Sequence, residues 1–212
     1  MHSYKKYLSD KSFVASVIIG FLFLAVSLVA QSMASNYTST VATVSVTDII
    51  LSNIRTYDVS LVFVYGAVLC FLLIVFECEK FPKYIPFILK STALFTVIRA
   101  FFISLTHIGE FPTHTIINPA FSWLHLNGIF TGVDGALFFS GHTGLPFLMA
   151  LIFWNHKKLR AIFLGFSVLF GIAVLLGHLH YSIDVFAAFF MAYGIFHIAK
   201  FIFKKDWQRS RS

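Results

Sequence analysis

The residues best suited to chemistry lie in two short segments, SGHT at 140–143 and HLHYSIDV at 178–185. In the second segment His180 precedes Asp184 by four residues, so both side chains share one helical face if that helix begins by Tyr181 or earlier. The carboxylate would then accept a hydrogen bond from one imidazole nitrogen and leave the other nitrogen as a base or nucleophile. A purely structural pair between these two side chains is the alternative.

The first segment has the composition of an anion site at the start of a helix. Ser140 is of a residue type that caps helix N-termini, and Gly141 permits close approach of a ligand to the backbone. The N–H groups of a first helical turn attract anions, and His142 would stand beside them to give or take a proton. Taken alone, SGHT is explained equally well by a surface cap. Together with the pair of His180 and Asp184, it predicts a site for an anionic substrate.

Two cationic side chains lie inside one apolar segment of the chain. Ionisable groups at membrane depth are costly, so each is a candidate for function. Arg99 lies toward one end of the segment, where a guanidinium favours a phosphate, with pairing to Asp184 as the alternative. Lys90 lies near the other end, where its long side chain is expected to snorkel to water and to have a structural role.

The overall composition indicates a membrane protein. Of the 212 residues, 58% are hydrophobic and 12% are charged, whereas roughly a quarter of a soluble domain is charged. The mean hydropathy is +0.83, and the chain holds 27 phenylalanines. This length fits a single transmembrane domain covering 1–212. Cys70 and Cys78 fall in one apolar segment and are expected to be buried thiols that do not report the redox compartment.

Six apolar runs are long enough, or nearly long enough, to cross a bilayer, which needs about 20 residues. Their approximate bounds are 13–33, 59–78, 86–107, 136–154, 161–178 and 183–203. The sequence therefore predicts an all-α fold, an integral membrane six-helix bundle. The first run has a second interpretation, because AQSMAS at 30–35 resembles a signal-peptidase site, but we expect an uncleaved helix.

The positions of lysine and arginine predict the orientation of the bundle. Thirteen of the sixteen lie on the side that also holds both ends of the chain, which predicts that both termini are cytoplasmic. Arg55 lies on the other side, and Lys90 and Arg99 lie inside the third run. The net charge of +7 is thus a topology signal, and no nucleic-acid partner is needed to explain it. In this orientation Arg99 and both polar segments converge on the outer half of the bundle.

These residues resemble the motifs of the type 2 phosphatidic acid phosphatase superfamily, and most closely those of its sphingomyelin synthase-like branch. In that branch the last motif reads H-x-H-Y-S/T-x-D-V, which residues 178–185 match, and an arginine is followed seven residues later by a threonine, here Arg99 and Thr106. The resemblance covers roughly residues 99–193 and leaves the first two predicted helices without a motif. It implies a six-helix membrane bundle whose site faces the non-cytoplasmic side.

The resemblance also implies a role for each matching residue. His180 would attack phosphorus to form a phosphohistidine, Asp184 would orient it, and His142 would protonate the leaving alcohol and then activate the acceptor. The residues implied to bind the phosphate are Arg99, Ser140 and Gly141. Phosphoryl transfer needs positive charge and fixed donors around the phosphoryl oxygens, which agrees with these residue types. No metal and no cofactor is expected.

The chain also departs from the family patterns. It lacks the lysine–arginine–proline first motif of the soluble and bacterial phosphatases and the Cys-Gly-Asp lead-in of the sphingomyelin synthases. Asp134 lies near the lead-in but out of register with Ser140, and either head-group binding or a plain turn explains it. Thr143, His178 and Tyr181 match the motifs and are further candidates without an assigned role.

The sequence leaves several functions open. Water as the acceptor would make a lipid phosphatase, whereas a hydroxyl of diacylglycerol or ceramide would make a sphingomyelin synthase-like head-group transferase. The sequence favours a lipid phosphatase or phosphotransferase acting on a phospholipid in the bilayer. The other classes are a haem- or metal-binding protein that uses His142 and His178, and a proton-coupled transporter.

We expect a bacterial inner membrane with the site facing the periplasm, with a eukaryotic Golgi or plasma membrane as the alternative. The oligomeric state is not predicted.

Overall fold

A computed structural model describes residues 7, 9–41, 44–117 and 137–211 of the chain. The regular elements among these residues are helical, and one isolated β-bridge joins Val44 to Ile108. The α-helices are α2 (Lys11–Val41), α3 (Ser60–Lys80), α4 (Ile85–Leu105), α5 (Gly141–Ile152), α6 (Lys157–Leu176), α7 (Ser182–Ile202) and α8 (Lys204–Arg211). Two short 3-10 helices are η1 (Leu51–Asn53) and η2 (Pro82–Tyr84). The predicted all-α fold is confirmed.

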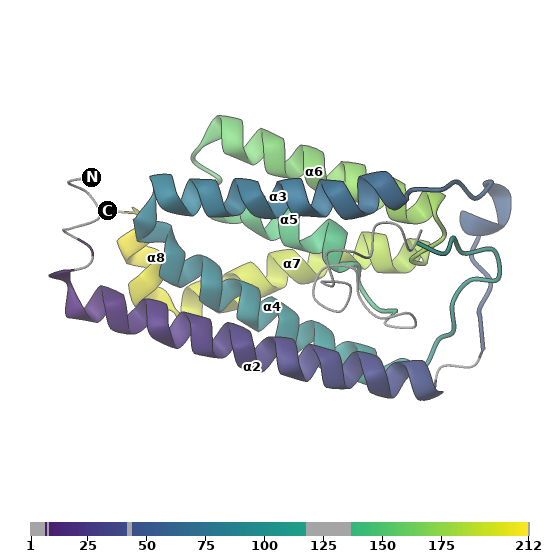
Figure 1. Cartoon of the computed structure of the whole chain (residues 1–212), viewed down its shortest axis with the longest axis horizontal. Helices are drawn as coiled ribbons and strands as arrows, with labels where there is room; N and C mark the ends of the chain where they lie inside the picture. The colour runs from purple at the N-terminus through teal and green to yellow at the C-terminus, as the bar shows by residue number, and fades with distance from the viewer. Residues whose placement is uncertain (1–6, 8, 42–43, 118–136, 212) are drawn as a thin grey trace.

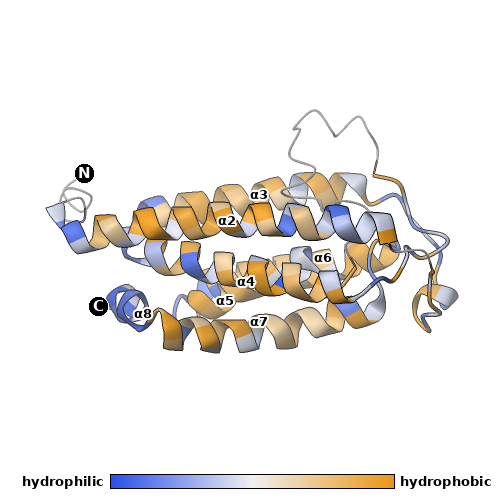
Figure 2. Ribbon diagram, turned by 90° about the horizontal axis from the view of Figure 1, so that it is seen from below, coloured by the Kyte–Doolittle hydropathy of each residue, from blue (hydrophilic) through white to orange (hydrophobic). Residues whose placement is uncertain are grey.

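Five of the described helices, namely α2, α3, α4, α6 and α7, are long and apolar enough to cross a membrane. At most 39% of the most apolar window of any of them is buried inside the protein, so their apolar side chains face outward, as lipid contact requires. Figure 2 shows hydrophobic ribbon along the length of the bundle and the hydrophilic α8 at one end. The chain is an integral membrane protein.

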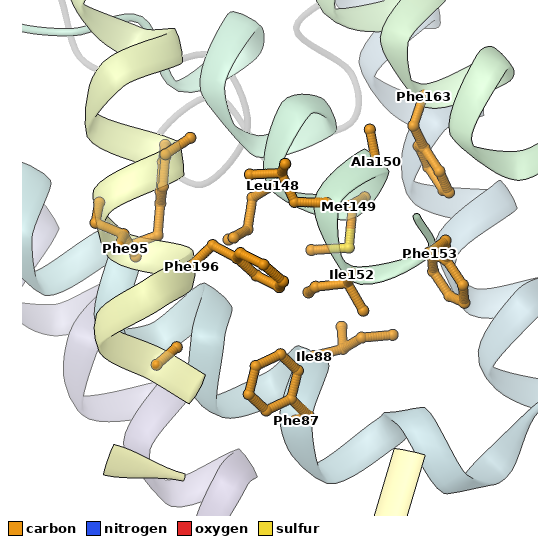
Figure 3. Packing of buried hydrophobic residues seen from close by; sticks show 14 of the residues in the cluster. Phe87, Ile88, Phe95, Leu148, Met149, Ala150, Ile152, Phe153, Phe163 and Phe196 are labelled. Carbon is orange, nitrogen blue, oxygen red and sulfur yellow. The ribbon is translucent and has the colours of Figure 1, made fainter. Parts of the chain in front are cut away.

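The predicted span at 136–154 contains the short helix α5. Its 12 residues correspond to about 18 Å, less than the roughly 30 Å of a bilayer core. The helix lies in the interior of the bundle, packed on α6 and α7, and Leu148, Met149 and Ile152 are fully buried. Figure 3 shows these side chains among large rings such as Phe95 and Phe196. Aromatic and aliphatic side chains therefore surround α5 and fix its position.

The first helix is longer than predicted. α2 continues to Val41, beyond the predicted end at 33, and it packs along α4 over much of its length (Figure 1). Small and polar residues face α4: the Cβ position of Gly20 adjoins Leu89, and the hydroxyl of Thr38 donates to the carbonyl of Ile103 at 3.2 Å. This close fit holds the two helices together.

Lys90 does not snorkel to water, which corrects that expectation. Its Nζ is 2.6 Å from Oδ2 of Asp206 and 2.7 Å from Oγ of Ser16, and Lys90 is only 8% exposed. The partner comes from α8, a short helix that the hydropathy of the chain did not predict. Ser16 in turn donates to Asp206, so α2, α4 and α8 meet in one polar cluster. The predicted structural role of Lys90 is compatible with this position.

The opposite end of the bundle is closed by described parts of two connecting segments, 44–58 and 108–117. The N–H of Gly109 donates to the carbonyl of Val44 at 2.8 Å, which joins the two segments side by side. The N–H of Thr115 donates to the carbonyl of Gly177, which ties them to the end of α6. We refer to 44–58 and 108–117 as the connecting layer.

Neither cysteine forms a disulfide with the described residues; Cys70 is buried, as predicted, whereas Cys78 is only partly buried.

Candidate active site

Arg99 and Thr106 hold the chain as it enters α5. Nε of Arg99 donates to the carbonyl of Phe139 at 3.3 Å, and the hydroxyl of Thr106 donates to the carbonyl of Leu137 at 3.0 Å. Seven residues are about two helical turns, so both side chains leave the same side of α4 and bind carbonyls two residues apart. The arginine–threonine spacing thus has a local structural reason, and it brings the guanidinium to the start of α5.

Ser140 caps α5, as its type predicted. Its hydroxyl accepts a hydrogen bond from the N–H of Thr143 at 3.4 Å. Among the described residues, no acceptor is found for the N–H groups of Gly141 and His142, which belong to the first turn. A Cβ at Gly141 would lie 3.6 Å from Nε of Arg99, so the guanidinium adjoins this turn. Helix N–H groups and a guanidinium together make a site of strong positive potential.

The two polar segments meet through their backbones. The N–H of Ser140 donates to the carbonyl of Asp184 at 3.0 Å, which joins the cap of α5 to the first turn of α7. The side chain of Arg99 adjoins the same start of α5, through its bond to the carbonyl of Phe139. The predicted convergence of Arg99, SGHT and HLHYSIDV is therefore seen in the structure.

His180 and Asp184 form the expected pair, but they do so without lying on one continuous helix, as the sequence had suggested. The helix begins at Ser182 rather than by Tyr181, so His180 precedes it. Asp184 lies in the first turn and reaches back, because its Oδ2 accepts from the N–H of Tyr181 at 3.1 Å. The same oxygen lies 3.2 Å from Nδ1 of His180. One carboxylate thus caps the helix and orients the imidazole, and Nε2 of His180 points away from this pair.

His142 is held by aromatic rings. Its imidazole stacks on Phe63 of α3 with ring centroids 3.9 Å apart and an interplanar angle of 27°. Phe170 of α6 forms an edge-to-face pair with the same imidazole, with ring centroids 5.7 Å apart. Nε2 of His142 is buried, and no hydrogen-bond partner is found for it among the described residues. One ring nitrogen of His142 is thus left without a hydrogen bond to the described residues.

His178 terminates α6 and binds the connecting layer. The N–H of His178 donates to the carbonyl of Leu175, and that of Leu179 donates to the carbonyl of Val174, the pattern of a Schellman motif. His178 occupies the left-handed position of that motif with φ 52°, which favours glycine. Its Nδ1 lies 2.7 Å from the hydroxyl of Thr113. Burial lowers the pKa of His178, which disfavours the charged form of its imidazole.

Tyr181 is buried and also binds the connecting layer. Its hydroxyl donates to the carbonyl of Gly109 at 2.9 Å and accepts from the N–H of Val46 at 3.1 Å. Tyr181 and His178 therefore hold the turn that carries His180 from both sides.

Asp48 is a residue that the sequence reasoning missed. Its Oδ2 accepts from the N–H of Ser182 at 2.7 Å, and its Oδ1 accepts from the N–H of Ile50 and of Leu51. Burial alone would raise the pKa of Asp48, but these hydrogen bonds outweigh it and hold the pKa below its usual range. The carboxylate thus caps α7 from a loop more than 130 residues earlier in the chain. The signal in the sequence was an aspartate, a residue type that caps helices, directly before the apolar residues 49–51.

The remaining candidates lie elsewhere. Thr143 is buried between helices, with its side chain beside Gly171 of α6, and its carbonyl accepts from the hydroxyl of Ser167. Asp134 lies outside the described residues. In the part of the chain that the structure describes, no group of three or more His, Cys, Asp or Glu side chains is arranged to hold a metal ion.

Fold and site together define a helical membrane protein with a cluster of polar residues that can bind and attack an anion. A family model, PAP2 superfamily C-terminal, matches residues 135–201, which include both polar segments. The match supports the type 2 phosphatidic acid phosphatase superfamily and a membrane lipid phosphatase-type function. Comparisons with curated proteins and with solved structures found no match.

Proposed function

We propose that this protein is a membrane-embedded lipid phosphatase or phosphotransferase that cleaves a phospholipid phosphoester through a phosphohistidine. The observation that carries the proposal is the backbone hydrogen bond from Ser140 to Asp184. It puts a capped helix start, suited to a phosphate, beside a histidine that a carboxylate orients. Phosphoryl transfer depends on such positioning and on positive charge around the phosphoryl oxygens.

In the first step the phosphoryl group binds at the start of α5, near Arg99 and the N–H groups of Gly141 and His142. Asp184 engages Nδ1 of His180, so Nε2 is the nitrogen that attacks phosphorus. The bond from phosphorus to the lipid oxygen breaks as the nitrogen–phosphorus bond forms. His142 gives a proton to the departing oxygen, and a free lipid alcohol leaves.

In the second step an acceptor replaces the lipid. His142, which has lost its proton, takes one from the acceptor hydroxyl, whose oxygen then attacks phosphorus. The nitrogen–phosphorus bond breaks and His180 is restored. Water yields phosphate or a free head-group phosphate, whereas a lipid hydroxyl yields a new phospholipid.

A second candidate is a sphingomyelin synthase-like head-group transferase. The full match of residues 178–185 to the last motif of that branch favours it, together with Arg99 and Thr106. In that reaction the phosphorylated head group stays on His180 until diacylglycerol or ceramide accepts it.

The distribution of charge supports a site on the non-cytoplasmic side. Thirteen of the sixteen lysines and arginines are expected on the other side. In a bacterial inner membrane this site would face the periplasm, and in a eukaryotic Golgi or plasma membrane it would face the lumen or the exterior.

The test is to purify the wild type and His180→Ala in detergent and to offer each a panel of acyl-labelled phospholipids that includes phosphatidic acid. Diacylglycerol or ceramide is added as acceptor in parallel reactions. Labelled products are separated by chromatography, and free phosphate is measured. We expect the wild type to release phosphate or to form a new phospholipid, and His180→Ala to do neither.

The matched control is His197→Ala. His197 lies on the same helix as Asp184, is exposed, and is about 20 Å farther along α7. It should behave as the wild type. Phosphate release by the wild type without acceptor identifies a phosphatase, and a new phospholipid formed only with acceptor identifies a transferase. Equal activity of His180→Ala and wild type on every lipid would rule out the phosphohistidine mechanism.

A further inference from the structure

A residue of α3, outside both polar segments, contacts the proposed general acid directly. Phe63 is 4% exposed, and its ring lies against the face of the His142 imidazole at 3.9 Å between centroids. α3 also lies outside residues 135–201, which the family model matches. The sequence assigned no role to this helix.

A second position of α3 supports the same arrangement. Gly66 lies three residues after Phe63, hence on the same face of the helix. A Cβ at Gly66 would lie 2.6 Å from Cε1 of Phe170, so the glycine admits that ring. Phe170 forms an edge-to-face pair with the imidazole of His142, with ring centroids 5.7 Å apart. The imidazole is therefore confined by a stacked ring on one face and by a second ring that α3 accommodates.

The two histidines of the site are oriented by different means. A carboxylate fixes His180 through a hydrogen bond to Nδ1. Among the described residues no hydrogen bond to the His142 side chain is found, and its buried Nε2 has no partner. Aromatic contact is thus what fixes the plane of the His142 ring. It leaves Nε2 without a hydrogen bond to the described residues, and so available for proton transfer.

We propose that Phe63 is a positioning residue that holds the His142 imidazole in the orientation needed to protonate the leaving lipid oxygen. This inference rests on the proposed function. Proton transfer matters most for an alkoxide, a poor leaving group, and little for nitrophenolate, which leaves without a proton. Loss of Phe63 should therefore slow the cleavage of alkyl phosphoesters more than that of aryl phosphoesters. A merely structural role would slow both alike.

The experiment compares the wild type, Phe63→Leu and Phe63→Tyr in a single turnover. One substrate is phosphatidic acid, and the other is p-nitrophenyl phosphate, whose burst of nitrophenol reports the same attack by His180. For Phe63→Leu we expect the rate with phosphatidic acid to fall about 10- to 100-fold, since misplacing a reacting group by about 1 Å costs up to ~10²-fold. The rate of nitrophenol release should change less than about threefold, because this leaving group departs without a proton. Phe63→Tyr keeps the stacked ring and should retain most of the alkyl activity.

Phe76→Leu is the matched control, because Phe76 lies on the same helix and is 58% exposed. Equal losses of both activities in Phe63→Leu, or no loss of either, would overturn the inference while leaving the proposed function intact. A wild type that cleaves neither ester and forms no phosphohistidine contradicts the proposed function, and the role of Phe63 with it.

A second readout does not need turnover. Stacking on Phe63 should shift the ring-proton resonances of His142 in histidine-labelled protein, with His142→Gln giving the assignment. We expect these resonances to move in Phe63→Leu and to stay near their wild-type positions in Phe63→Tyr. Unchanged resonances in Phe63→Leu would show that Phe63 does not hold the ring.

Discussion

Two clusters of buried polar side chains lie near opposite ends of the bundle, and they differ in how fully their hydrogen bonds are made. One cluster lies where α2, α4 and α8 meet, and we call it the inner cluster. Its members Lys90, Asp206 and Ser16 bond to one another at 2.6–2.7 Å. The other cluster is the candidate active site, and we call it the outer cluster. There His180 and Asp184 are paired, but Nε2 of His142 is buried without a partner among the described residues. Buried polar groups are normally satisfied, so an exception calls for an explanation. A closed network suits a structural role, whereas an incomplete one suits the binding of a substrate.

The sharpest test of this difference is the same substitution at both clusters. In the outer cluster, Asp184→Asn keeps an oxygen for the N–H of Tyr181 but no longer offers a carboxylate to His180. We expect lipid turnover to fall by about 10³- to 10⁴-fold, as when the carboxylate behind a catalytic histidine becomes an amide. The midpoint of thermal unfolding in detergent should change little. Full turnover in this variant would contradict the orienting role of Asp184.

In the inner cluster, Asp206→Asn should have the opposite result. It leaves the charge of Lys90 buried without a carboxylate, and breaking a buried ion pair in this way costs about 3–5 kcal/mol. The variant should unfold at a markedly lower temperature, while its turnover per folded molecule stays near that of the wild type. The double variant Lys90→Met, Asp206→Leu should recover much of the stability, because no charge is then left unpaired. A loss of turnover in folded Asp206→Asn would show that the two clusters are coupled.

A smaller effect is expected where the connecting layer meets the outer cluster. Asp48→Ala removes the carboxylate that caps α7, which should cost about 0.5–2 kcal/mol. The pKa of Asp48 lies below its usual range, so its contribution to stability is complete above the unfolded pKa of about 3.9 and is lost as the pH falls through the folded pKa. The difference in melting temperature between wild type and variant should therefore be largest above about pH 5 and shrink toward pH 3. A difference that does not vary with pH would exclude this role of the carboxylate.

The smallest effect concerns the strained backbone at His178. His178→Ala and His178→Gly both remove the imidazole that contacts Thr113, but only glycine relieves the left-handed conformation at φ 52°. The alanine variant should be the less stable of the two by about 1 kcal/mol. Equal melting temperatures would mean that the turn relaxes when the imidazole is removed.

Hydropathy and residue type predicted much of this molecule, because membrane burial and helix capping act locally. The long spans, the cap at Ser140 and the meeting of Arg99 with both polar segments follow from such local rules. The pair of His180 and Asp184 was expected, although a capping aspartate and not a continuous helix brings it about. The short length of α5 was not foreseen, since apolar residues continue on either side of it.

What the sequence did not predict depends on contacts between distant residues. The partner of Lys90 lies 116 residues away on α8, and Asp48 reaches Ser182 across 134 residues. Phe63 is one of 27 phenylalanines, and nothing in its neighbours distinguishes it from a ring that faces lipid. Phe63 reaches His142 of α5 because α3 packs against α6, which in turn packs against α5.

The link between Ser140 and Asp184 joins two backbones, so no side chain contributes to it. Any residue except proline can stand at position 140 without removing the donor. The relative position of the helix start and the histidine is therefore insensitive to most substitutions around it. Under the proposed function, the neighbouring side chains can be exchanged to change which lipid binds, while His180 and the start of α5 keep their spacing.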